Sequence, residues 1–249
     1  MWEGQLAFAE QGWRVIAPQL RGFDDPGGQV SARPDETGPP TAVRREETYP
    51  ASVDDYAGDV IDLLDALHID TAVIGGLSMG GYIAFAILRH AARYVHGLIL
   101  ADTRSQADTP GDADGRKRML QLVQDKGPAA VAGEMLPKLL GDTTRAAHPE
   151  VAEQVRSLIL SNSANAIAGA IRALMTRPDS TPLLQTIHFP TLIMVGAEDA
   201  VTPPSAAEEM HRRIAGSQLT IIPAAGHLTN LEQPQAFNEA LARFLGHRV

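Results

Sequence analysis

Cysteine is absent from this 249-residue chain, which excludes disulfides, thiolate metal sites and a cysteine nucleophile. An excess of basic charge is also absent. The formal net charge is −9, and this argues against a nucleic-acid or anionic-membrane partner. No apolar run reaches the roughly 18 residues that would span a bilayer, and residues 1–20 lack the pattern of a signal peptide. These absences together predict a cytoplasmic protein.

Aromatic residues make up only 5% of the chain, and none lies between Thr103 and His188. That stretch is helical in character, with Gly, Pro and Asn between its periodic segments. The expected helices there span residues 117–124, 129–140, 149–160 and 164–175. We therefore expect residues 103–187 to form a helical cap inserted between two strands.

The rest of the chain alternates short β-branched runs with longer helical patterns. Nearly continuous apolar runs are typical of parallel strands buried on both faces, and they occur at residues 14–17, 71–75, 96–101, 191–195 and 218–222. Helices are expected at residues 2–11, 52–67, 79–93 and 235–245. The alternation predicts an α/β fold with a doubly wound, mostly parallel sheet, whose core comprises residues 1–102 and 188–249.

Residues 24–51 interrupt this alternation with many Pro, Gly and charged residues and almost no apolar periodicity. A loop of that length is unusual inside a compact domain. Two interpretations stay open, a surface insertion or a flap over a site.

The strongest local motif is Gly76-Leu-Ser-Met-Gly80, which follows an apolar strand and opens a helix. It matches G-x-S-x-G, in which a sharp strand-to-helix turn holds the serine in a strained, exposed position. We expect the flanking glycines to give this turn its room. The helix N-terminus that begins at Met79 would favour negative charge beside Ser78.

A serine hydroxyl is a weak nucleophile without a base, so a histidine has to reach it. Of the eight histidines, His227 alone follows a predicted strand, in the order Pro223-Ala-Ala-Gly-His227. It would therefore lie at the carboxyl edge of the sheet, where Ser78 emerges and where open α/β sheets bind ligands.

The base in turn needs an acid that fixes its tautomer. Asp199 closes Val195-Gly-Ala-Glu-Asp199 after another strand at the same edge and is the favoured partner. Asp102 also ends a strand there, after Leu98-Ile-Leu-Ala, and remains the alternative acid. The order Ser78, Asp199, His227 is the order expected for α/β-hydrolases.

The chain resembles the α/β-hydrolase superfamily over nearly its whole length. The matching segments are residues 15–23 (VIAPQLRGF), 76–81 (GLSMGG), 98–102 (LILAD), 195–199 (VGAED) and 226–227 (GH). Ala101-Asp-Thr-Arg104 and the aliphatic helical insertion look similar to the branch of 3-oxoadipate enol-lactonases and small carboxylesterases.

The resemblance also implies segments that this sequence does not contain. Related hydrolases begin with an N-terminal block that holds further strands and a His-Gly loop, and that loop donates an N–H to the oxyanion hole. We therefore expect an N-terminally shortened sheet. Met79 would supply one oxyanion donor, and the source of a second is left open.

These observations predict a serine hydrolase that cleaves a small ester or lactone through an acyl-enzyme on Ser78. The alternatives are a non-catalytic ligand-binding homologue, or a perhydrolase or acyltransferase with the same triad. No metal or organic cofactor is expected, and the oligomeric state is left open. The pocket could be lined by apolar side chains of the insertion, although packing within the core of the insertion is the simpler use for Met119, Met135, Leu136, Met175 and Leu183.

Overall fold

The computed structural model describes residues 1–23, 50 and 52–248. The predicted 24–51 segment therefore lies, apart from Pro50, outside the described residues. Within them, four strands form one sheet in the order β1-β2-β3-β4, and every neighbouring pair is parallel. The strands are β1 (Ala72–Leu77), β2 (Val95–Ala101), β3 (Thr191–Gly196) and β4 (Gln218–Ile222). Four of the five predicted strands are thus confirmed.

The fifth prediction, a strand over residues 14–17, is wrong. These residues lie outside any helix or strand. Val15 does pack against the buried apolar cluster under the sheet, as the pattern suggested, whereas Ile16 is exposed. A strand also needs a neighbour for its backbone N–H and C=O groups, and none pairs with this segment among the described residues.

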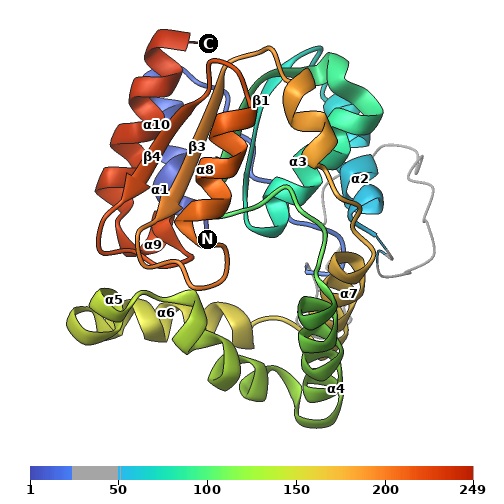
Figure 1. The fold of residues 1–249 in the computed structure, drawn as a ribbon, viewed down its shortest axis with the longest axis vertical. Coiled ribbons are helices and arrows are strands. Elements are labelled where there is room, and N and C mark those ends of the chain that lie inside the picture. The colour runs from blue at the N-terminus through green and yellow to red at the C-terminus, as the bar shows by residue number, and fades with distance from the viewer. Residues whose placement is uncertain (24–49, 51, 249) are drawn as a thin grey trace, which may run out of the picture.

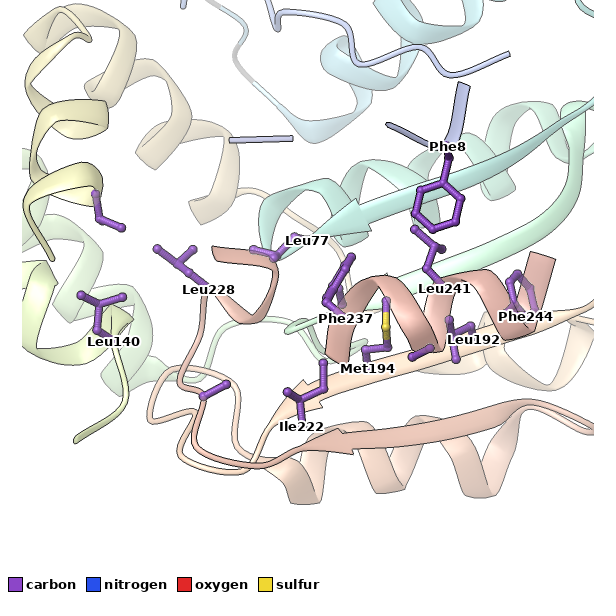
Figure 2. Close-up of a cluster of buried hydrophobic side chains, with 14 of the residues drawn as sticks. Phe8, Leu77, Leu140, Leu192, Met194, Ile222, Leu228, Phe237, Leu241 and Phe244 are labelled. Atoms are coloured by element: carbon purple, nitrogen blue, oxygen red, sulfur yellow. The ribbon is translucent and has the colours of Figure 1, made fainter. Parts of the chain in front are cut away.

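Alternation along the strands sends successive side chains to opposite faces of the sheet. Leu192 and Met194 of β3 join a cluster with Phe237 and Phe244 of α10 (Pro234–Arg248). Figure 2 shows this layer, with Phe8 lying over Leu241 of the same helix. Phe8 belongs to η1 (Ala7–Gln11), which continues α1 (Glu3–Leu6), so the predicted 2–11 helix is half 3₁₀.

The opposite face of the sheet is covered by three helices. Ile193 and Val195 pack with Phe85 of α3 (Met79–Ala91) and Met210 of α8 (Pro204–Arg213). α2 (Val53–Ala66) packs against α3 and begins at a capping box formed by Ser52 and Asp55. A short 3₁₀ turn, η2 (Ala92–Tyr94), leads from α3 into β2. Helices on both faces confirm the doubly wound arrangement.

Between β2 and β3 the chain forms four helices that lie together beyond the sheet, on the side of α9 (Thr229–Glu232) (Figure 1). They are α4 (Pro110–Leu139), α5 (Asp142–Ala147), α6 (Pro149–Leu160) and α7 (Ala164–Met175), and η3 (Thr181–Thr186) follows them. The predicted bounds of α6 and α7 are confirmed. The two helices predicted at 117–124 and 129–140 are the halves of α4, which is kinked at Gly127 (φ 72°). The sequence reading missed α5, α8 and α9.

No single helix of the described residues is long and apolar enough to cross a bilayer; α6 and α7 reach that length and composition only together, across a 94° bend.

Candidate active site

Ser78 lies in the turn between β1 and α3 and has a positive φ angle (φ 52°, ψ −112°). A non-glycine residue adopts such a conformation only where its surroundings hold it there. Its N–H donates to the Ala101 carbonyl at 2.9 Å, and its own carbonyl accepts from the Thr103 hydroxyl at 2.9 Å. The turn is therefore fixed to the end of β2 through its backbone.

The glycines around Ser78 differ in how much space a side chain would have at each position. A Cβ on Gly76 would lie 2.1 Å from the Gly80 carbonyl carbon, and one on Gly81 would lie 2.5 Å from the Thr103 hydroxyl. A Cβ on Gly80 would meet nothing within 4 Å, and one on Gly75 would make ordinary contacts. The expectation that both motif glycines prevent a clash is therefore correct for Gly76 and wrong for Gly80, because Gly80 faces open space.

His227 lies in the loop that follows β4, and its side chain reaches Ser78. Its Nε2 is 2.8 Å from the Ser78 Oγ, and its Nδ1 is 2.9 Å from an oxygen of Asp199. The histidine is only 2% exposed. Three predicted residues from the ends of three strands thus meet in one hydrogen-bonded row, with the imidazole in the middle.

Asp199 is held by a turn directly after β3. One of its carboxylate oxygens accepts the N–H groups of Val201 and Thr202, and the other accepts the Thr202 hydroxyl at 2.7 Å. Burial alone would raise the pKa of Asp199, but the hydrogen bond and positive charge of His227, with the donors of Thr202, lower that pKa below its ordinary value. The carboxylate is therefore the stable form beside the imidazole.

Thr202 was missed by the sequence reasoning. Besides its bond to Asp199, its hydroxyl lies 3.2 Å from the Nδ1 of His227. Asp followed three residues later by Thr is a recognisable turn signal, because an aspartate side chain accepts backbone N–H groups just ahead of it. That signal predicts the turn, and only the fold shows that the hydroxyl also faces the histidine.

Asp102, the alternative acid, has no hydrogen bond to His227 among the described residues. One of its oxygens accepts the Gly196 N–H at 3.0 Å, and the other accepts the Thr229 hydroxyl. It is fully buried, and this burial raises its pKa to about 7 although the charge of His227 and the Thr229 bond act in the opposite direction. The structure thus brings Asp199, and not Asp102, to the imidazole.

Met79 is the first residue of α3. The first N–H groups of a helix have no acceptor within that helix, so the Met79 N–H is available at the end of α3 next to Ser78. The same helix end carries partial positive charge. It can therefore stabilise an anion that forms near the serine hydroxyl.

The five apolar residues suggested as a pocket lining do not form one surface. Met119, Met135 and Met175 pack in a cluster inside the α4–α7 region, which is the simpler of the two uses expected for them. Leu136 instead joins the larger cluster that includes Leu77, Leu140 and Leu228, and Figure 2 shows Leu228 lying between the other two. Leu183, in η3, is half-buried and outside these clusters.

The larger cluster includes the residues next to Ser78 and His227 in the sequence. Leu77 directly precedes Ser78, and Leu228 directly follows His227. The backbone on one side of each of these two residues is therefore anchored in the buried cluster. Within the described residues, no group of three or more His, Asp or Glu side chains is placed to hold a metal ion.

Comparison with known proteins gives consistent matches. A family model described as "Alpha/beta hydrolase family" matches residues 1–240. The chain is 30% identical over 241 residues to 3-oxoadipate enol-lactonase 2 of Acinetobacter baylyi, a match that covers 97% of this chain and 82% of the relative.

Solved structures of other hydrolases are similar to this chain as well. A thermophilic esterase from Thermogutta terrifontis (malate bound) superposes with a TM-score of 0.85 at 38% identity, covering 98% of this chain and 84% of that one. The enol-lactonase from Burkholderia xenovorans LB400 has a TM-score of 0.81 at 24% identity, covering 99% and 86%, and it supports the fold alone.

Proposed function

The chain belongs to the alpha/beta hydrolase family, and on that premise we propose that it is a serine hydrolase that cleaves a small ester or lactone through an acyl-enzyme on Ser78. The observation that carries the proposal is the continuous row from the Ser78 Oγ through the two nitrogens of His227 to Asp199, at 2.8 Å and 2.9 Å. Similarity to an enol-lactonase and an esterase supports this class of substrate.

In the first half of the reaction, His227 Nε2 takes the proton of the Ser78 hydroxyl as its Oγ attacks the carbonyl carbon. Asp199 accepts the Nδ1–H, keeps the lone pair of Nε2 directed at Ser78, and stabilises the imidazolium that forms. The negative charge on the carbonyl oxygen is stabilised by the Met79 N–H and the N-terminus of α3. The imidazolium then protonates the departing alkoxide, which leaves an ester on Ser78.

In the second half, His227 removes a proton from water, and the hydroxide attacks the ester on Ser78. The acid product leaves as the proton returns to the serine oxygen. With a lactone the alkoxide stays attached to the acyl chain, so the product is a single hydroxy acid. The α4–α7 helices, which we propose form a cap over this site, bring aliphatic side chains and no aromatic ones, and this favours small or aliphatic acyl groups.

The test is labelling with a fluorophosphonate probe together with hydrolysis of p-nitrophenyl acetate. We expect wild type to be labelled and active, and Ser78→Ala to lose both properties because the nucleophile is gone. Ser205→Ala is the matched control, because Ser205 is exposed on α8 and should leave both unchanged. A folded wild-type protein that takes no label would favour a non-catalytic binding protein instead.

A further inference from the structure

Glu232, the last residue of α9, is a buried carboxylate without a salt bridge among the described residues. Three backbone N–H groups satisfy it instead. Its Oε1 accepts from Gly226 at 2.9 Å and Leu228 at 3.1 Å, and its Oε2 accepts from Gly141 at 2.8 Å. Burying a charged group costs free energy unless hydrogen bonds compensate it. The three N–H groups that donate to Glu232 therefore have to stay close to its carboxylate.

Two of these donors stand on either side of His227. The N–H of His227 itself donates to the Leu139 carbonyl at 2.9 Å. Three consecutive N–H groups, at positions 226 to 228, are therefore bound to fixed acceptors. Any movement of the backbone that carries the imidazole would therefore break at least one of these three hydrogen bonds.

The Leu139 acceptor and the Gly141 donor belong to residues 139–143, which comprise the end of α4, the start of α5 and the two residues between them. We call these residues the α4–α5 junction. A Cβ on Gly226 would lie 2.3 Å from the Gly141 nitrogen, so the loop and the junction touch backbone to backbone. Glu198, next to Asp199, accepts from the N–H of Thr143 at 2.9 Å. One junction is thus tied to the loops of both His227 and Asp199.

We propose that Glu232 is a positioning residue for the reaction, which holds the His227 loop against the α4–α5 junction so that Nε2 stays within hydrogen-bond distance of Ser78. The inference rests on the proposed function. Chemistry depends on this alignment more steeply than binding does, since a displacement of about 1 Å can cost on the order of 10²-fold in rate. Losing the hydrogen bonds of Glu232 to the His227 loop and to the α4–α5 junction should therefore lower kcat and leave KM nearly unchanged.

The sharpest variant is Glu232→Gln, which keeps the size of the side chain. A glutamine has one acceptor oxygen, so it can bind the loop or the junction but not both, and its NH₂ group would face an N–H. We expect kcat for p-nitrophenyl acetate to fall about 10- to 100-fold, KM to stay within about twofold of wild type, and probe labelling of Ser78 to slow in proportion to kcat. Glu239→Gln, the same change at an exposed site on α10, is the control and should alter neither.

The outcomes separate this inference from the proposed function. A Glu232→Gln protein with wild-type kcat overturns the inference, and so does one whose melting temperature falls while the kcat of the folded protein is unchanged. If that variant does not fold, Glu232→Asp decides by the same measurements, since it keeps both oxygens one methylene further from the donors. A wild-type protein without label or activity contradicts the proposed function itself.

Discussion

The ends of β2 and β3 lie side by side in the sheet, and each presents a buried aspartate. Asp102 directly follows β2, and Asp199 comes three residues after β3. They are 0% and 4% exposed, respectively. Nevertheless the pKa of Asp102 is raised to about 7, and that of Asp199 is lowered below its ordinary value.

Their hydrogen-bond partners explain this difference. Asp199 faces an imidazole that can carry positive charge, and three donors from Val201 and Thr202 stabilise its charged form. Asp102 joins Gly196 of β3 to Thr229, which follows the His227 loop, and forms no ion pair within the described residues. Burial therefore does not distinguish the two carboxyls, whereas contact with His227 does.

The largest expected effect comes from exchanging each carboxyl for an amide. Asp199→Asn should lower kcat/KM by about 10⁴-fold, because an amide can donate to Nδ1 and so favours the wrong tautomer of His227. Asp102→Asn should lower it by less than about 10-fold, since Asp102 does not contact the imidazole. Steady-state hydrolysis of p-nitrophenyl acetate measures both. Equal losses would mean that Asp102 also serves the base.

Asp102 should make the free energy of unfolding depend on pH. Between about pH 4 and pH 7 the unfolded chain has lost the Asp102 proton and the folded protein has kept it, so wild-type stability should fall as pH rises through this window. Asp102→Asn removes this titration. Its stability relative to wild type should therefore rise across the window by up to about 4 kcal/mol, measured by urea unfolding at several pH values.

Asp199 provides the contrast for that experiment. Its folded pKa is lowered, so its contribution to stability is present above about pH 4 and is lost as the pH falls further. Relative to wild type, the stability of Asp199→Asn should therefore stay constant between about pH 4 and pH 7 and should rise as the pH falls below about 4. A rise between pH 4 and pH 7 equal to that of Asp102→Asn would show that the two carboxyls do not differ in charge state.

The smallest expected effect comes from the hydroxyls beside the two aspartates. Thr202→Val removes the one hydroxyl that donates to Asp199 within the described residues and should lower kcat about 10-fold, corresponding to roughly 1–1.5 kcal/mol for one hydrogen bond. Thr229→Val removes a donor to Asp102 and should change kcat by less than about threefold while it reduces stability by a similar free energy. A larger kcat loss for Thr229→Val would reverse the comparison.

Much of the site could be predicted because its signals are local. Gly76-Leu-Ser-Met-Gly80 specifies a strand, a tight turn and a helix within a few residues, and a histidine just after an apolar run marks the same edge of a parallel sheet. The order of strands and helices follows from hydrophobic periodicity in the same way. The predicted strand at residues 14–17 failed because pairing depends on a distant neighbour, which the pattern of one segment does not contain.

The amino-acid sequence determined most of the helices and four of the strands, the turn at Ser78 and the candidates for base and acid, because each depends on side chains within a few positions of one another. Only the tertiary structure decided that Asp199 rather than Asp102 meets His227, that Thr202 joins them, and that Glu232 binds the His227 loop to residues 139–143. Those choices depend on distances of a few ångströms between segments far apart in the chain, and such distances are set when helices and sheet pack together.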